Sequence, residues 1–349
     1  MTELASTSDE LKRTKATLAH WSHHFQTLYG SSLPRSYLAY DLESSGFSRQ
    51  NDLILEWGHC LVRDTKIVDR NAIYLNWYAL PDVVPSGWLD SRLDRIKFEM
   101  QAAGRAWHIT PELLKTKGVH PKRAIQFIYD LFQTVIAQPD MAIVGHNIRA
   151  FDSQMLESSF AQDLGIDFTF PLGRVFDTGV IEKASQMAGD DRLTPKHGES
   201  FDDYMHRINY TKLSGVKWNL DPHCIEKYGL TASHGIGRDA MHGAGTDAYV
   251  VHLLFERYRG IANAFAAEAI GNKPPAVSPP VRAARRPPPS PTVVPSTLVH
   301  ADKGIKVDKE AQARETLAAA QAVRAETKRY IDACFDKPTG QNFRRQRNR

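Results

Sequence analysis

The order of apolar and polar stretches along the chain predicts an α/β fold, in which one sheet is covered by helices. Three strand-like runs come first, at about 37–43, 53–62 and 66–80, and segments with helical spacing follow them. A short apolar run at 141–145, typical of a buried strand, lies among the helical segments. Strands that are followed by alternating helices are typical of a single sheet with helices packed against it.

The composition agrees with a folded domain. The chain has 349 residues, of which 42% are hydrophobic and 24% charged, and this excludes disorder over its whole length. No apolar run approaches about 18 residues and residues 1–15 are polar, so neither a membrane-spanning helix nor a secretory signal is expected. Cys60, Cys224 and Cys334 are too far apart to predict a disulfide framework or a zinc site, and a cytoplasmic location away from membranes is expected.

The first expected element is an amphipathic helix at 8–29. Ser8 can cap its N-terminus, and two acidic residues lie in its first turn. Its apolar residues recur at helical spacing, namely Leu11, Leu18, Trp21, Phe25 and Leu28. Residues 1–35 are therefore expected to pack as a helix against the main body of the protein.

The body, residues 36–271, is expected to open with an antiparallel meander. The segment 63–66 fits a tight turn between the second and third strands. Helices are expected at about 89–103 and 121–138, and the strand at 141–145 follows.

The second half of the body is predicted to be mainly helical. One helix is expected to begin near Ala150 and another at Phe176-Asp177-Thr178. Residues 190–217 are polar and irregular, and they are interpreted as an inserted loop. Helices are expected again at 221–228 and 245–267.

The segment 272–349 differs sharply in charge from the rest. It carries 16 lysines and arginines against 7 aspartates and glutamates, a net charge of +9, which leaves −5 for residues 1–271. Nine prolines lie within the 22 residues from 274 to 295, so 272–300 is predicted to be an extended linker. Residues 301–349 then form a basic, partly helical tail, which either meets a polyanion or protein partner or is simply disordered.

Two carboxylates, Asp41 and Glu43, come at the end of the first predicted strand. Residues two apart lie on one face of a strand, so these side chains would repel each other unless a cation lies between them. Taken alone, the pair fits a solvated strand end better than a site. The following Ser44-Ser45-Gly46 fits a tight turn that brings backbone N–H groups close to a ligand.

A second polar cluster follows the strand at 141–145. His146 and Asn147 come directly after it, and Phe151 and Asp152 begin the next helix. Polar residues just beyond a buried strand are typical of a functional site. The alternative is that Asp152 only caps the helix.

The third cluster is His242 and Asp247, ahead of and within the last long helix of the body. Asp247 shares a helical face with Val251, Leu254 and Tyr258, so it is expected to face the sheet, where a buried acid needs a partner such as a metal ion. Two glycines between the pair favour a mobile loop from which His242 could turn toward Asp247.

These clusters together resemble the DEDD superfamily of 3′→5′ exonucleases, in its histidine subclass. That family includes the proofreading subunit of bacterial replicative DNA polymerase, ribonuclease T and oligoribonuclease. Asp41 and Glu43 match its first motif, Asp152 its second, and His242 with Asp247 its third. The segments 39–46, 52–58 and 108–112 are also similar to family segments. Ser44-Ser45-Gly46 replaces a common Thr-Thr-Gly, and 190–217 is longer than compact members need.

The resemblance implies a ribonuclease H-like fold, a mixed five-stranded sheet with helices on both faces. It also implies two Mg²⁺ ions, with Mn²⁺ able to substitute, held by Asp41, Glu43, Asp152 and Asp247. Asp41 would bridge the ions, and His242 is suited to accept the proton of the attacking water.

The resulting expectation is a metal-dependent 3′→5′ exonuclease that releases nucleoside 5′-monophosphates from DNA and acts on single strands in proofreading or repair. By position, the terminal nucleotide would contact Ser44, Ser45, His146, Asn147 and Phe151. Two alternatives remain open: an enzyme of the same fold that degrades RNA or oligonucleotides, and a non-catalytic module that binds nucleic acid or a polymerase. The tail would be the site for a polymerase or another protein partner.

Overall fold

A five-stranded sheet forms the centre of the computed structural model, which describes residues 8–29, 33–186, 196–212, 218–220, 227–237 and 240–271. The strand order is β3-β2-β1-β4-β5. The strands are β1 (Ser36–Ser44), β2 (Ile54–Arg63), β3 (Lys66–Tyr74), β4 (Met141–Gly145) and β5 (Val175–Asp177). The first three pair antiparallel, whereas β4 runs parallel to β1 and β5 parallel to β4. This mixed sheet confirms the predicted ribonuclease H-like α/β fold.

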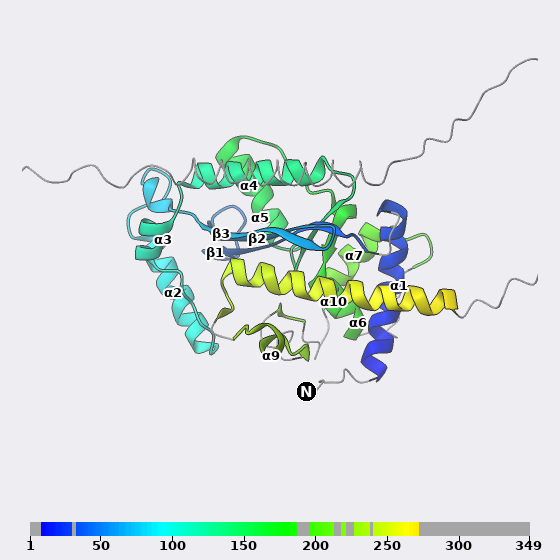
Figure 1. Ribbon diagram of the computed structural model, residues 1–349. Coiled ribbons are helices and arrows are strands. Elements are labelled where there is room, and N and C mark those ends of the chain that lie inside the picture. Colours follow the sequence, from blue (N-terminus) through cyan, green and yellow to red (C-terminus); the bar gives the residue numbers. More distant parts are fainter. Residues whose placement is uncertain are drawn as a thin grey trace, which may run out of the picture.

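Helices cover both faces of the sheet (Figure 1). On one face lie α4 (Pro121–Ile136) and α5 (Asp152–Ser159), and on the other lie α10 (Ala244–Gly271), α6 (Thr178–Gln186) and α1 (Ser8–Tyr29). The remaining helices are α2 (Trp88–Ala102), α3 (Pro111–Lys117), α7 (Phe201–Tyr210) and α9 (Leu230–His234), with short turns at Trp77–Ala79, Phe160–Leu164 and Leu172–Arg174.

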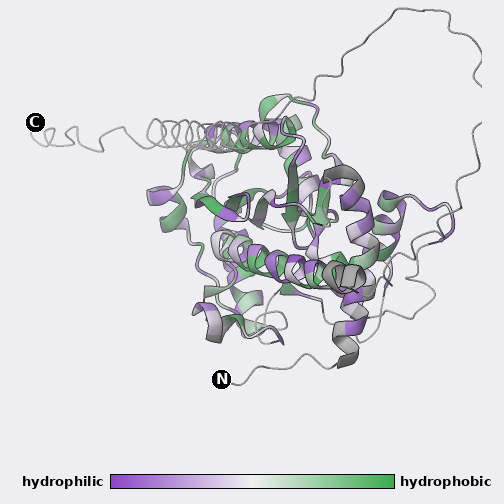
Figure 2. Ribbon diagram, turned by 45° about the vertical axis from the view of Figure 1, so that its right-hand side comes forward, coloured by the Kyte–Doolittle hydropathy of each residue, from purple (hydrophilic) through white to green (hydrophobic). Residues whose placement is uncertain are grey.

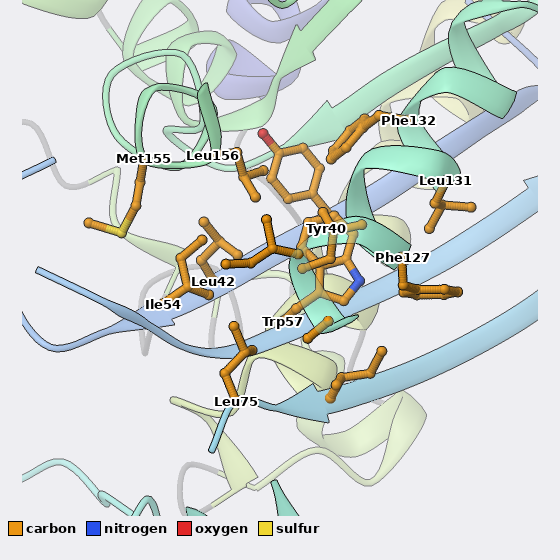
Figure 3. Close-up of a cluster of buried hydrophobic side chains, with 14 of the residues drawn as sticks. Tyr40, Leu42, Ile54, Trp57, Leu75, Phe127, Leu131, Phe132, Met155 and Leu156 are labelled. Atoms are coloured by element: carbon orange, nitrogen blue, oxygen red, sulfur yellow. The ribbon is translucent and has the colours of Figure 1, made fainter. Parts of the chain in front are cut away.

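Strand β1 divides the interior into two cores because successive side chains point to opposite faces. Leu38, Tyr40 and Leu42 join the core under α4, where Tyr40 and Trp57 stack with ring centroids 5.0 Å apart (Figure 3). Tyr37 and Ala39 belong to the second core, under α10 and α1. In Figure 2 the hydrophobic residues concentrate on the central strands, while the helices carry both kinds of residue.

Helix α1 packs on the body through aromatic side chains. The ring of Trp21 lies 4.6 Å from that of Phe176 in β5 and 5.2 Å from that of Phe201 in α7. His24 stacks on Phe201 at 3.7 Å, and its Nε2 lies 2.8 Å from the carbonyl oxygen of Gly173. The apolar spacing seen in the sequence thus matches a helix that is docked against both the sheet and α7.

Several elements differ from the sequence expectations. The third strand ends at Tyr74 rather than near residue 80, because the chain turns at Trp77 and buries that side chain. The helix expected from Phe176 begins at Thr178, and the residues before it form β5, which is only 3 residues long and too short to show a strand pattern.

The segment interpreted as an irregular inserted loop contains helix α7. Ser200 caps it by accepting a hydrogen bond from the backbone N–H of Asp203. Its inner face buries Tyr204, Met205 and Ile208, which gives a polar sequence a narrow apolar stripe.

Parts of the sequence expectations fall outside the described residues. These are 1–7 and 30–32 of the N-terminal segment, 190–195 and 213–217 of the proposed insertion, most of the helix expected at 221–228, the linker at 272–300, the tail at 301–349, and both Cys224 and Cys334. Cys60 is a buried free cysteine on β2. Among the described helices, none combines the length and apolar character needed to cross a membrane.

Candidate active site

Asp41 and Glu43 lie near the C-terminal end of β1, on the face that α10 covers. They alternate with Leu42, and so share a face with Tyr37 and Ala39 of the second core. Both side chains are half-buried. The antiparallel register places Asp41 opposite Gly58, so no side chain on β2 fills the space beside this carboxylate.

That gap is filled by the beginning of α10. A Cβ atom on Gly58 would lie 2.0 Å from the backbone carbon of Ala244, and one on Gly245 would lie 2.8 Å from the Cβ of Ala72. The helix backbone therefore rests directly on β2 and β3. This close contact brings Asp247, which is buried in the first turn of α10, over the acidic end of β1.

His242 lies just ahead of α10, as the sequence predicts, and completes a group of possible ligands. One side-chain atom from each of Glu43, His242 and Asp247 lies within 4.8 Å of the others. His242 has a φ of 63°, an uncommon value for a residue other than glycine. The next residue, Gly243, accepts hydrogen bonds from the backbone N–H groups of Thr246 and Asp247, at 2.8 and 2.9 Å.

Asp152 reaches the same edge of the sheet from a different element. Strand β4 runs parallel to β1, so the carboxyl ends of the two strands lie together, and Asp152 is buried in the first turn of the helix that follows β4. The pKa of Asp152 is raised to about 7. Burial is the main cause, backbone hydrogen bonding opposes it, and the charge of Asp177 adds to the increase.

The pKa values of the other two carboxyls reflect the same crowding. Withdrawal from water raises the pKa of Asp41 well above its usual value, and neighbouring carboxylates add to the effect, in the order Asp152, Asp247, Glu43 and Glu56. The pKa of Glu43 is raised by burial and then by Asp247. The structure thus brings together all four predicted acids, and their charges oppose one another.

The chemistry of this donor set fits a divalent cation. Carboxylate oxygens are the ligands that Mg²⁺ and Mn²⁺ prefer. A cation would neutralise charges that otherwise have to be suppressed by protonation. Asp41, Glu43, Asp152 and Asp247 are the residues that could hold it.

The turn after β1 is held from within by Ser45 and Asp52. The Ser45 hydroxyl donates to Oδ1 of Asp52 at 3.0 Å and accepts from the N–H of Leu53 at 2.9 Å, and Ser45 is fully buried. Ser44 is half-buried, and its hydroxyl donates to the carbonyl oxygen of Gly46 at 2.7 Å. The side chain of Ser45 therefore shapes the turn, whereas Ser44 lies at its surface.

Phe47 is a residue of this turn that the sequence motifs do not include. It is 88% exposed, and its ring meets that of Phe151 edge to face, with centroids 5.7 Å apart. Phe151 directly precedes Asp152, so the aromatic pair lies beside the acidic group. The available signal was an aromatic residue immediately after the Ser-Ser-Gly turn.

The polar residues after β4 have different surroundings from one another. His146 is buried, with Nδ1 2.9 Å from the Thr178 hydroxyl and Nε2 2.6 Å from the carbonyl oxygen of Trp218, and burial lowers its pKa. Asn147 is half-buried with a φ of 61°, and its N–H donates to the buried carboxylate of Asp177. Both ring nitrogens of His146 are thus engaged with the protein, while the side chain of Asn147 lies nearer the surface.

Glu56 and His108 form a pair at the same site. Both lie in segments that resemble family segments, but neither was predicted to be a site residue. Glu56 lies on β2 opposite Glu43 and is 2% exposed. His108 precedes α3, and its Nε2 lies 3.1 Å from Oε2 of Glu56. The strand register places Glu56 beside the acidic group, and the contact with Glu56 brings in His108, 52 positions further along the chain.

No protein-family model matches the sequence, and no curated protein matches it. Among solved structures, the chain is similar to E. coli exonuclease I in its zinc-bound complex with single-stranded DNA, with 14% identity and a TM-score of 0.44 over 68% of this chain and 43% of that one. Its complex with a dT13 oligonucleotide gives 15% identity and a TM-score of 0.43, over 67% of this chain and 43% of that one. The chain therefore aligns with less than half the length of exonuclease I.

Proposed function

We propose that this protein is a metal-dependent 3′→5′ exonuclease that hydrolyses DNA to nucleoside 5′-monophosphates. The observation that carries the proposal is the meeting of Asp41, Glu43, Asp152 and Asp247 with His242 at one edge of the sheet. These residues come from β1, α5, α10 and the loop before α10, and burial and mutual repulsion raise the pKa values of three of the acids. The direction of attack and the choice of DNA rest on the resemblance of the three sequence motifs.

The four carboxylates would hold two Mg²⁺ ions, which supply stabilisation for the negative charge that develops on the phosphate and on the leaving 3′ oxygen. Asp41 is central to this arrangement because it interacts electrostatically with each of the other three acids. His242 lies within reach of Glu43 and Asp247 and is the group we assign as general base. An imidazole titrates near neutral pH, so it can accept the proton of the attacking water.

The terminal nucleotide is proposed to lie against Phe47 and Phe151. An exposed aromatic ring offers a stacking surface to any base, worth about 1–3 kcal/mol. Ser44 and Asn147 are the polar side chains near this surface. Ser45 and His146 are assigned a supporting role, because their polar atoms already bind the turn and the segment at Trp218.

The test is a digestion series on 3′-labelled DNA and RNA, single- and double-stranded, with Mg²⁺, Mn²⁺ or EDTA. We expect release of nucleoside 5′-monophosphates from single-stranded DNA, dependence on the metal, and resistance of a 3′-blocked strand. Asp41→Asn should abolish the reaction, whereas Asp94→Asn, at an exposed position on α2, is the matched control. Cleavage of circular single strands at a comparable rate would contradict the proposal, and faster digestion of RNA would reassign the substrate.

A further inference from the structure

The segment that carries His242 needs support from its surroundings. A non-glycine residue with positive φ is strained and persists only where neighbouring groups hold it. His242 has a φ of 63° and lies directly before Gly243, whose carbonyl oxygen accepts the first hydrogen bonds of α10. Whatever contacts Gly243 therefore helps to fix the conformation of His242.

His108 makes that contact. A Cβ atom on Gly243 would lie 3.0 Å from Cε1 of His108, so the imidazole rests against the bare backbone of this glycine. The same ring meets Tyr74 of β3 edge to face, with centroids 6.1 Å apart. His108 thus touches the end of the sheet on one side and the start of α10 on the other.

Glu56 fixes the ring of His108 in this position. Its side chain is 3% exposed, and its Oε2 lies 3.1 Å from Nε2 of His108. A buried carboxylate needs a hydrogen-bond donor or a cation. Because Glu56 lies opposite Glu43 in the strand register, the partner of this carboxylate is anchored directly beside the acidic group.

We propose that His108 is a positioning residue for the reaction, held by Glu56 and pressing on Gly243 so that His242 keeps its orientation. It acts through His242 and does not itself touch the substrate. The inference rests on the proposed function, since His108 is proposed to position the general base of that reaction. It predicts an effect on turnover rather than on substrate binding.

Three variants distinguish the role of the hydrogen bond between His108 and Glu56 from that of the volume that the His108 ring fills. His108→Gln keeps a donor at the position of Nε2, His108→Leu keeps volume without a donor, and Gly243→Ala places a methyl group against the ring. His206→Gln is the matched control, because His206 is an exposed histidine on α7 whose ring contacts Tyr210. Thermal melting of each variant verifies that the fold is intact.

Steady-state kinetics on a short oligonucleotide with Mg²⁺ provide the first readout. His108→Leu and Gly243→Ala should each lower kcat about 10–100-fold with KM nearly unchanged, as when a supporting group misplaces a reactive one. The two changes combined should cost no more than either alone, because they break the same contact. His108→Gln should recover most of kcat. Wild-type kcat in His108→Leu, or a loss expressed in KM, would overturn the proposal.

The second readout does not depend on activity. In ¹⁵N-histidine-labelled, metal-free protein, the ring signals of His242 should shift in His108→Leu and Gly243→Ala, but not in His108→Gln or His206→Gln. Unshifted His242 signals in the first two variants would refute the positioning role even if the protein proved not to be a nuclease. A wild type without nuclease activity but with the expected shifts would refute only the proposed function.

Discussion

Two regions of this protein hold acidic side chains partly or wholly away from water, and they do so in opposite ways. At the edge of the sheet, Asp41, Glu43 and Asp152 face other carboxylates, and their pKa values are raised. In α6, by contrast, Glu182 is fully buried, yet its pKa is lowered. Burial alone would raise it, but Lys227 at 3.1 Å and two tyrosine hydroxyl groups more than offset that effect.

The surroundings of Glu182 are those of a structural acid. The hydroxyl groups of Tyr228 and Tyr258 donate to Oε1, while Lys227 binds Oε2, so the protein itself satisfies the negative charge. The acids at the sheet edge face like charges instead. The comparison indicates that an acid which stabilises the fold is surrounded by hydrogen-bond donors and positive charge from the protein. A group of acids that repel one another instead lacks this compensation, and a bound cation can supply it.

The largest expected effect comes from Asp41→Asn. Removing one carboxylate from the repelling group should abolish nuclease activity, because the metal site loses its most central ligand. In EDTA above neutral pH, the same variant should melt at a higher temperature than the wild type, since one ionised group fewer has to be accommodated. Nuclease assays and thermal melts with the chelator measure the two effects. Full hydrolysis by the variant would rule out the metal site.

His242→Ala distinguishes the loss of proton transfer from the loss of a carboxylate charge at the candidate active site. We expect a loss of about 10²–10⁴-fold in rate, the usual contribution of a general base. Because the substitution removes no carboxylate, it should not give the increase in melting temperature expected for Asp41→Asn in EDTA. The acidic limb of the pH–rate profile should disappear with the histidine. A retained limb would assign the base to another residue.

Glu182→Gln should have the opposite effects to Asp41→Asn. The variant should lose stability and keep its turnover. Hydrogen bonds to a charged group contribute about 1.5–3 kcal/mol, so urea unfolding should show a loss of that order. Since the folded-state pKa of Glu182 is lowered, its contribution is present above the usual glutamate pKa and is lost as the pH falls through the folded value. The difference from wild type should therefore shrink in acid. Loss of kcat in folded Glu182→Gln protein would contradict the comparison.

A smaller effect concerns the response of stability to pH without metal. The pKa of Asp152 is raised to about 7, above the value of about 3.9 for an unfolded chain, so its ionisation costs stability as the pH rises between these values. The melting temperature in EDTA should fall across this range, and Mg²⁺ should suppress the fall. Asp152→Asn should flatten the curve, with Asp94→Asn as control. An increase in melting temperature across this range in EDTA would contradict the raised pKa.

The smallest expected effect comes from removing the basic segment 272–349 from the acidic body of the protein. We propose that this segment binds nucleic-acid phosphates without reading sequence, through residues such as Arg282, Arg285 and Arg286. Truncation after Gly271 should preserve turnover on short oligonucleotides and weaken binding to long ones. The slope of log affinity against log salt should become shallower by about 0.7 for each phosphate of a single strand that the truncated protein no longer neutralises. Equal binding at every salt concentration would favour a protein partner for the tail.

The acids at the sheet edge could be predicted because each signal is local. Asp41 and Glu43 come at the end of an apolar run, and Asp247 lies on a helical face that the spacing of Val251 and Leu254 defines. The five-stranded sheet was implied by the motif resemblance, and the structure confirms it. β5 could not be found from its own residues because three buried positions carry no periodicity.

Other features depend on pairings that a single sequence does not contain. Glu56 borders the site only because of the β1–β2 register, and His108 reaches it only because the segment before α3 folds back over β3. The glycines at 243 and 245 suggested a mobile loop, whereas in the structure they permit close contact with His108 and Ala72. Substrate contacts by Ser44, Asn147 and Phe151 stay predictions.

The backbone contact between β2 and α10 has a consequence for how this sequence can change. At Gly58 even a methyl group would meet the main chain of Ala244 at 2.0 Å, and main chain cannot rotate aside as a side chain can. In a saturation mutagenesis library selected only for folded protein, substitutions at Gly58 should be among the most strongly depleted. They should be depleted more than substitutions at Asp41. Selection for stability and selection for activity would then single out neighbouring residues that face each other across one strand pair.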